Sequence, residues 1–262
     1  CRQLGIIHVP DIDHSPQGIP FFGAIAESAA IHGKHDIQCY INCDILIGKN
    51  FIEAVQNIRH EKYLIIGQRI NLAEGVSFNV TDPDYLIRLK MLARAGKAFL
   101  HPSSGSDYFV FRRGMWEGLQ PVVIGRGGYD NALINHCLRK SIPVIDASFD
   151  IKIFHPVHDY NHIQGGKTEV FGGSEAKKNI GSLATAYIPT LIDADWIIKN
   201  GRLKRNYCRG DRLRSFWSSR FIRGRKNFFS FLAYLLWICL RTMGLRGRSQ
   251  LSLEKLLDET TD

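Results

Sequence analysis

The 262-residue sequence predicts an α/β protein in which a mixed, mostly parallel β-sheet is flanked by helices. Short apolar runs alternate with amphipathic stretches through the first 200 residues, which is the pattern of layered α/β folds. The chain is 45% apolar, enough to form one substantial core. This composition excludes a disordered or collagen-like chain, and the six cysteines lack the CxxC spacing of a zinc ribbon.

Six apolar runs are the predicted strands. They are Gly5–Val9, Ile37–Ile41, Tyr63–Gly67, Tyr108–Phe111, Ile142–Asp146 and Lys152–Phe154. Four amphipathic stretches between them are the predicted helices. They are Pro20–His32, Asn50–His60, Asp84–Ala95 and Tyr129–Lys140. Glycine-rich loops at 125–128, 165–166 and 172–173 follow the later strands, so the second half is predicted to form the mouth of a site.

The positive charge is concentrated in one segment. Residues 1–201 hold 20 Lys and Arg against 20 Asp and Glu, whereas residues 202–248 hold 13 against Asp211 alone. The formal net charge of +9 therefore arises in a basic, aromatic-rich stretch. We expect a domain at 1–201, followed by a basic helical tail at 202–262.

Within this tail, the apolar run Phe228–Leu240 is predicted to be a helix. Its 13 residues would extend roughly 20 Å, too short for a bilayer core of ~30 Å. Basic residues on both sides favour peripheral contact with a membrane surface through residues 220–248. A helix docked on the main domain is the alternative, and nucleic-acid binding is less favoured. The scattered cysteines favour a reducing compartment, so a cytoplasmic location is expected.

Acidic residues follow or precede several predicted strands. Asp44 comes shortly after the strand that ends at Ile41, and a carboxylate there can hold a divalent cation. The alternative is that Asn42 and Asp44 only form a turn and cap the next helix. Asp107 precedes a strand and Asp130 begins a helix, so either could contact an acceptor hydroxyl or act as a general base. A plain helix cap is the alternative for Asp130.

A histidine cluster follows the strand that ends at Phe154. His155 and His158 could complete a metal shell begun by Asp44, because imidazole and carboxylate ligands suit a cation such as Mn²⁺ or Zn²⁺. Ordinary polar histidines in a loop are the alternative. His162 belongs to the same cluster.

Further polar residues are candidates for holding substrate. Gln68 and Arg69 end a predicted strand, and Asn131 follows Asp130 at a helix start. Lys167 follows a glycine pair and could close over a diphosphate, since glycine permits loop motion and lysine supplies charge. An exposed strand end is the alternative for Gln68 and Arg69, and an ordinary surface loop is the alternative for Lys167.

Over about residues 4–200, the chain resembles a GT-A type nucleotide-sugar glycosyltransferase, close to the family 2-like group. The segments that carry the resemblance are, in order, Tyr40–Ile47, Leu64–Arg69 (LIIGQR), Gly105–Phe111 (GSDYFVF), Gly127–Ile134 (GGYDNALI) and His155. The resemblance implies a GT-A-like (Rossmann-like) fold and a DXD-type metal motif at 42–44. It also implies an acceptor-side Asp107, a helix-start acid at Asp130 and a late histidine ligand at His155.

The implied activity is hexosyltransferase-like transfer from a nucleoside diphosphate sugar to a hydroxyl of a glycan, lipid or protein. Asp44, through Mn²⁺ or Mg²⁺, would neutralise the diphosphate, and Asp130 would be the base of an inverting reaction. The GGYDN segment also resembles retaining enzymes, so both stereochemical outcomes stay open.

The chain departs from the family pattern at two places. Asn42 stands at the first acidic position of the metal motif, which leaves one carboxylate. The sequence opens with what reads as a later strand, so we expect the N-terminal βαβ unit to be missing and these residues alone to be insufficient for turnover.

Two other functions compete with the transferase. A sugar-phosphate nucleotidylyltransferase would need a glycine-rich basic phosphate loop near its start, which this sequence lacks. A non-catalytic membrane-associated or nucleic-acid-binding module would depend on the basic tail.

Overall fold

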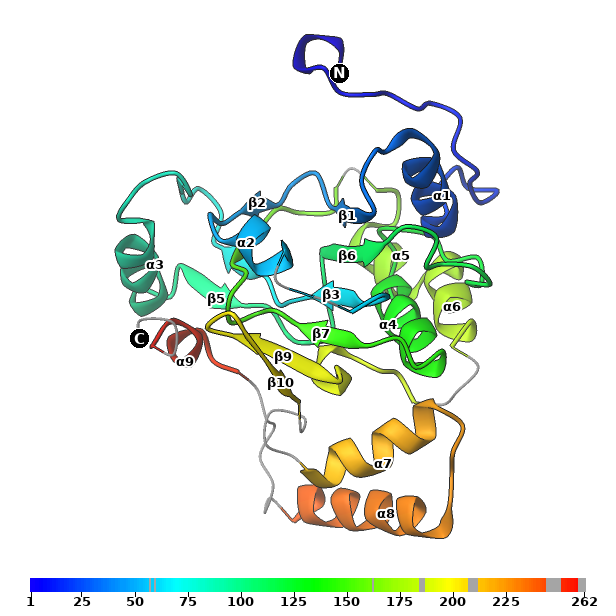
Figure 1. Ribbon diagram of the computed structural model, residues 1–262. Coiled ribbons are helices and arrows are strands. Elements are labelled where there is room, and N and C mark those ends of the chain that lie inside the picture. Colours follow the sequence, from blue (N-terminus) through cyan, green and yellow to red (C-terminus); the bar gives the residue numbers. More distant parts are fainter. Residues whose placement is uncertain are drawn as a thin grey trace.

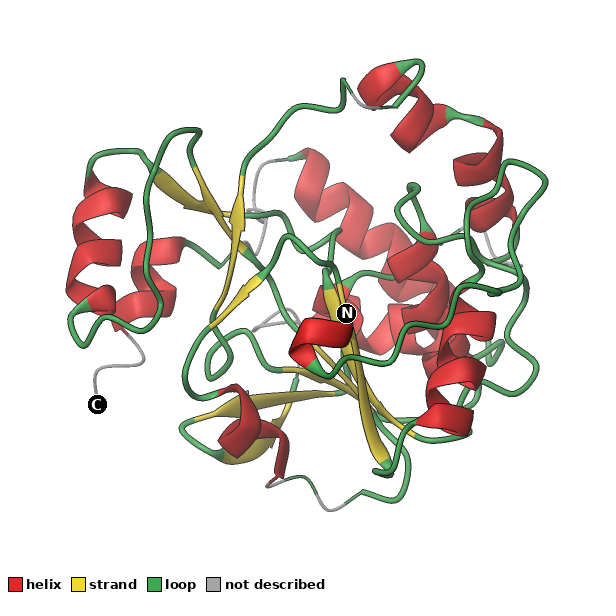
Figure 2. Ribbon diagram, turned by 90° about the horizontal axis from the view of Figure 1, so that it is seen from above, coloured by secondary structure: helices red, strands yellow, loops and turns green. Residues whose placement is uncertain are grey.

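The computed structural model describes residues 1–56, 58, 60–161, 163–183, 187–206, 212–243 and 251–258. Its described residues form a mixed α/β fold with two sheets and helices around them (Figures 1 and 2). The larger sheet has the strand order β1-β6-β3-β7-β9-β10. Its strands are β1 (Ile37–Ile41), β3 (Leu64–Ile66), β6 (Tyr108–Arg112), β7 (Val144–Asp146), β9 (Trp196–Lys199) and β10 (Arg202–Arg205).

Four strands of the larger sheet share one direction. β3 pairs in parallel with β7, and β7 with β9, while β6 runs antiparallel between β1 and β3. β10 closes the far edge as an antiparallel hairpin with β9. The sheet is therefore mixed, as the sequence predicts, but only two of its five neighbouring strand pairs are parallel.

The smaller sheet has the order β2-β8-β4-β5. Its strands are β2 (Leu46–Ile47), β4 (Ile70–Leu72), β5 (Ala98–Leu100) and β8 (Ile153–Pro156). β4 follows β3 after a three-residue link, and β8 follows β7 in the chain. In each of these two pairs, the first strand belongs to the larger sheet and the second to the smaller sheet. The polar residues of the β3–β4 link are thereby placed at the junction of the sheets.

Both faces of the larger sheet are buried. Leu64 and Ile66 of β3 belong to one apolar cluster and Ile65 to another, because successive strand residues point to opposite faces. Helices α1 (Phe22–His32) and α4 (Tyr129–Arg139) contribute to the first cluster, and α2 (Phe51–Gln56) contributes to the second. Burial on both sides explains why β3 reads as a continuous apolar run.

Further helices surround this frame. They are α3 (Tyr85–Arg94), α5 (Gly166–Gly172), α6 (Ser174–Gly181), α7 (Arg212–Ile222), α8 (Phe228–Thr242) and α9 (Leu253–Asp258), with 3₁₀ turns η1 (Arg2–Leu4) and η2 (Leu191–Asp193). α7 packs against α4, α8 packs against α7, and α9 packs against α3 (Figure 1). The boundary expected between residues 201 and 202 falls inside the β9–β10 hairpin.

Most predicted elements form within a few residues of the expected positions. Strands at 37–41, 63–67, 108–111, 142–146 and 152–154, all four predicted helices and the helix at 228–240 are confirmed. The predicted strand Gly5–Val9 is wrong: η1 precedes it, Gly5 is left-handed at φ 65°, and Ile6 and Ile7 are exposed. An apolar run needs a neighbouring strand to pair with, and the described residues offer none here.

Candidate metal and catalytic site

A cavity of about 1050 Å³ lies where the ends of both sheets meet the first turns of α4 and α5. Its lining includes, among the residues predicted from the sequence, Asn42, Asp44, Arg69, Asp107, Asp130, Asn131, His155, His158 and Lys167. These residues come from segments far apart in the chain. The structure therefore brings nine of the ten candidate residues to one cavity.

Asp44 contacts both predicted histidines. Its Oδ2 lies 3.1 Å from Nε2 of His155, which is in β8, and 3.1 Å from Nε2 of His158 in the following loop. One ligand atom of each residue lies within 4.8 Å of the others, the arrangement of a three-residue cation site. His162 of the same predicted cluster lies outside the described residues.

The hydrogen-bond chemistry of this triad favours a positive charge between its members. Nδ1 of His158 lies 2.7 Å from the carbonyl oxygen of Asp159, which can only accept, so this nitrogen carries a proton. A neutral His158 then presents the Nε2 lone pair to the Asp44 carboxylate, and two acceptors cannot bond each other. A proton on Nε2 or a bound cation resolves the conflict.

Two buried atoms of the triad have no hydrogen-bond partner within the described residues: Oδ1 of Asp44 and Nδ1 of His155. Burial opposes ionisation of Asp44, but the hydrogen bond from His158 and the proximity of the His155 imidazole outweigh it and lower the pKa of Asp44. Burial and nearby Arg69 lower the pKa of His155, which favours the neutral imidazole that ligates metals. The donor set and the unpaired carboxylate oxygen fit a divalent cation.

A second polar group surrounds Asp107, which is buried. Nη1 of Arg69 lies 2.6 and 2.7 Å from the two carboxylate oxygens of Asp107, and Nδ2 of Asn42 donates to Asp107 Oδ1 at 2.9 Å. The Tyr40 hydroxyl donates to Asn42 Oδ1 at 3.0 Å. Asn42, at the first position of the DXD-like motif, therefore orients Asp107.

Asp130 lies in the first turn of α4 and is buried. Its two carboxylate oxygens accept backbone N–H bonds from Ser106 at 3.1 Å and Asn131 at 2.9 Å. Burial raises the pKa of Asp130 to about 7, those hydrogen bonds oppose the rise, and the charge of Asp107 adds to it. A carboxylate with a pKa near neutrality can accept a proton and release it again at physiological pH.

The remaining predicted residues are placed differently. Gln68 is buried, donates from Nε2 to the carbonyl of His101 at 2.6 Å, and is not among the residues that line the cavity. Asn131 lines the cavity, but its side-chain Nδ2 donates to the carbonyl of Pro189 at 2.8 Å. Lys167 is exposed in the first turn of α5 at the rim of the cavity.

Sequence reasoning missed His101 and Asn71. Both line the cavity, with Nδ2 of Asn71 3.3 Å from Nδ1 of His101, and Nε of Arg69 donates to Asn71 Oδ1 at 2.9 Å. Burial and the charge of Arg69 lower the pKa of His101 to about 4. Both residues belong to or adjoin the smaller sheet, whose short strands give almost no periodic signal.

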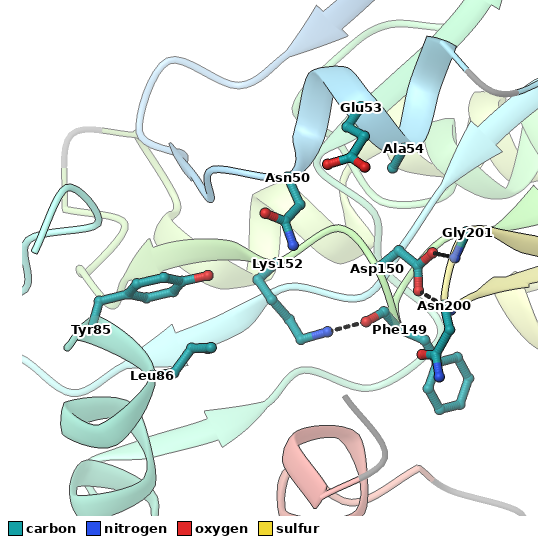
Figure 3. A pocket seen from close by; sticks show the side chains of 10 residues that line it. All are labelled: Asn50, Glu53, Ala54, Tyr85, Leu86, Phe149, Asp150, Lys152, Asn200 and Gly201. Atoms are coloured by element: carbon teal, nitrogen blue, oxygen red, sulfur yellow. Dashed lines mark hydrogen bonds between the residues drawn. The ribbon is translucent and has the colours of Figure 1, made fainter. Parts of the chain in front are cut away.

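A second cavity, of about 240 Å³, lies between α2, α3 and the β9–β10 turn (Figure 3). Its Lys152 is buried and donates from Nζ to the carbonyl oxygens of Ser148 and Phe149, so backbone groups engage the ammonium. Asp150 accepts from the backbone N–H groups of Asn200 and Gly201 at 2.9 and 2.8 Å. These bonds stabilise the loop, and the cavity offers weaker ligand chemistry than the larger one.

Comparison of the chain with protein-family models, with curated proteins and with solved structures finds no match. Along the described part of the chain, every helix is too short or too polar to cross a bilayer.

Proposed function

We propose that this chain is a metal-assisted glycosyltransferase that moves a sugar from a nucleoside diphosphate sugar to a hydroxyl acceptor. The observation that carries the proposal is the joint placement of the Asp44–His155–His158 triad and buried Asp130 on one large cavity. A cation site and a carboxylate base are the two groups that an inverting, metal-assisted transfer uses. The resemblance of the sequence supplies the substrate class.

Asp44, His155 and His158 would hold the divalent cation, which suits Mn²⁺ or Mg²⁺ because both accept carboxylate ligands and Mn²⁺ tolerates imidazole well. When bound, the cation neutralises charge that develops on a leaving diphosphate. The single carboxylate of the triad contributes one formal negative charge. Asp44 is therefore the residue on which cation affinity depends most.

Asp130 is the proposed general base. The acceptor oxygen forms a bond to the anomeric carbon, the bond from that carbon to the diphosphate oxygen breaks, and the acceptor proton passes to Asp130. A pKa of about 7 lets the carboxylate take this proton and return it to solvent. In-line attack by the acceptor would invert the anomeric configuration.

Asp107 is better suited to positioning than to proton transfer, because Arg69 engages both of its carboxylate oxygens. The ion pair fixes Arg69 beside the triad, where a guanidinium can face a diphosphate oxygen. Lys167 at the rim supplies a second, exposed positive charge. The basic side chains of Arg69 and Lys167 thus lie on the side of the cavity that holds the triad and α5.

The test combines cation binding with nucleotide chemistry. Titration calorimetry with Mn²⁺ measures the triad directly, and nucleotide release from a panel of nucleotide sugars, with and without Mn²⁺, measures turnover. Asp44→Asn is expected to weaken Mn²⁺ binding at least tenfold, since it removes the single carboxylate of the triad. Asp11→Asn, at an exposed residue that does not line the cavity, is the matched control.

Metal-dependent release or binding of one nucleotide sugar, lost in Asp44→Asn and kept in Asp11→Asn, would support the proposal and identify the donor. If no nucleotide sugar is bound or cleaved by the 262-residue chain or by the full reading frame that contains it, with or without Mn²⁺, the transferase proposal is overturned. If Mn²⁺ binds Asp44→Asn as tightly as the wild type, the assignment of the triad is wrong.

A further inference from the structure

We propose that the outer face of α8 binds the surface of an anionic lipid bilayer. This inference goes beyond the proposed transferase activity and does not depend on it. α8 is the outermost helix at its end of the molecule, with α7 between it and the larger sheet (Figure 1). One face of α8 therefore has α7 as its neighbour.

The inner face of α8 is well packed. Trp217 of α7 is 1% exposed and lies against Tyr234 and Trp237 of α8, with ring centroids 5.1 and 5.4 Å apart. Ser230 and Ala233, on the same side of the helix, are buried. Asn227 caps the helix by accepting from the backbone N–H of Ser230 at 2.8 Å. Among the described residues, the contacts that hold α8 in place are thus those of its inner face with α7.

The outer face of α8 is apolar and exposed. Each of its large side chains is at least 42% exposed: Phe228, Phe229, Phe231, Leu232, Leu235 and Leu236. Helical spacing places Phe228, Phe231 and Leu235 on one line, opposite Ser230 and Ala233. A contiguous apolar surface of this kind marks an interaction site, whereas single exposed apolar residues do not.

Charge decides which partner fits this surface. The sequence has no Asp or Glu between Asp211 and Glu254. Arg225 and Lys226 precede α8 and Arg241 lies in its last turn, and none of the three forms an ion pair with a described carboxylate. By contrast, Arg223 pairs with Asp195 at 2.6 Å, which ties α7 to the main body.

An apolar face with cations at both ends and no acid matches the interface of an anionic bilayer, where acyl chains accept the apolar side chains and headgroups attract the cations. A second copy of this chain fits less well, because a symmetric contact would bring two sets of cations together without carboxylates. The 15 residues of α8 extend about 22 Å, so the helix would lie along the surface and not cross it.

Vesicle flotation of the full 262-residue chain tests this inference. We expect the wild type to float with vesicles of phosphatidylcholine and phosphatidylglycerol and to stay unbound with phosphatidylcholine alone. A triple substitution, Phe228→Ser/Phe231→Ser/Leu235→Ser, should abolish flotation, because each substitution lowers the affinity for the vesicles roughly tenfold. Because all three side chains are exposed, circular dichroism should show an unchanged fold.

Two further variants make the test specific. The matched control, Ile31→Ser/Ile87→Ser/Met91→Ser, changes apolar residues on α1 and α3 that are at least 61% exposed and should float like the wild type. Arg225→Gln/Lys226→Gln should weaken binding to anionic vesicles about 25-fold, because each cation contributes about fivefold.

The inference is overturned if the wild type fails to float with anionic vesicles, or if the α8 triple variant floats as well as the wild type. Equal flotation with neutral vesicles would overturn the role of charge. Self-association of the wild type that the triple variant loses, without vesicle binding, would assign the face to a second copy of the chain.

Discussion

Replacing Asp130 with asparagine should remove a pH dependence from the stability of the protein. The pKa of Asp130 is raised to about 7 in the folded state, mainly by burial, from an ordinary value of 3.8. The folded state therefore binds the Asp130 proton more tightly than the unfolded state does. The stabilisation from this proton is fully present at low pH and is lost as pH rises from about 4 to about 7.

The difference of about 3 pKa units corresponds to about 4 kcal/mol over the whole window. Between pH 5 and pH 8, the linkage relation gives a fall of roughly 3 kcal/mol in the free energy of unfolding. Asp130→Asn should lack this fall, because an amide does not titrate. The variant keeps at least one backbone acceptor contact, since an amide oxygen can still accept from the N–H of Asn131.

Urea unfolding of the wild type, Asp130→Asn and the control Asp11→Asn at pH 5, 6, 7 and 8 measures this effect. The difference between the wild type and Asp130→Asn should shift by roughly 3 kcal/mol in favour of the variant as pH rises. Contributions from other titrating groups cancel in that difference. Parallel curves for all three proteins would refute the assignment of a raised pKa to Asp130.

The remaining predictions concern the metal, the membrane face, a buried ion pair and a glycine at the start of a helix. Mn²⁺ should bind the wild type at least tenfold more tightly than Asp44→Asn in calorimetry, and the outer face of α8 should be needed for flotation with anionic vesicles. Arg69→Met should lower the free energy of unfolding by about 3 kcal/mol in urea titration, because Asp107 is left charged and buried; an unchanged midpoint would argue against the ion pair. Gly128→Ala should lower the free energy of unfolding by about 1–2 kcal/mol in the same measurement, since Gly128 has a φ of 85° and a Cβ there would lie 2.5 Å from Ile180. An unchanged free energy of unfolding would contradict the left-handed conformation of Gly128 at the start of α4.

The local sequence pattern predicted which residues belong to the candidate metal site, but not that they would meet in space. Asp44, His155 and His158 were recognisable by residue type and position after strands, and they meet although 111 and 114 residues separate Asp44 from the two histidines. Their meeting follows from the antiparallel pairing of β2 with β8, which sets Leu46 against Phe154. No local periodicity encodes that two-residue pairing.

The electrostatic roles of the acids required the tertiary structure. Asp107 and Asp130 look alike in the sequence, each beside a predicted element. Arg69 pairs with Asp107 across 38 residues, whereas the buried Asp130 accepts, within the described part of the chain, from the backbone N–H groups of Ser106 and Asn131. Desolvation and charge pairing depend on every neighbour in space, so a single segment cannot specify them.

The sequence by itself determined the α/β class, the positions of the longer strands and helices, and the location of the basic charge in the last 60 residues. These properties are local, because apolar spacing and composition act within one segment. The tertiary structure alone decided that Gly5–Val9 has no strand to pair with, that short strands form a second sheet, and which carboxylate is neutralised. Pairing, burial and pKa are properties of contacts between distant segments, which exist only once the chain has folded.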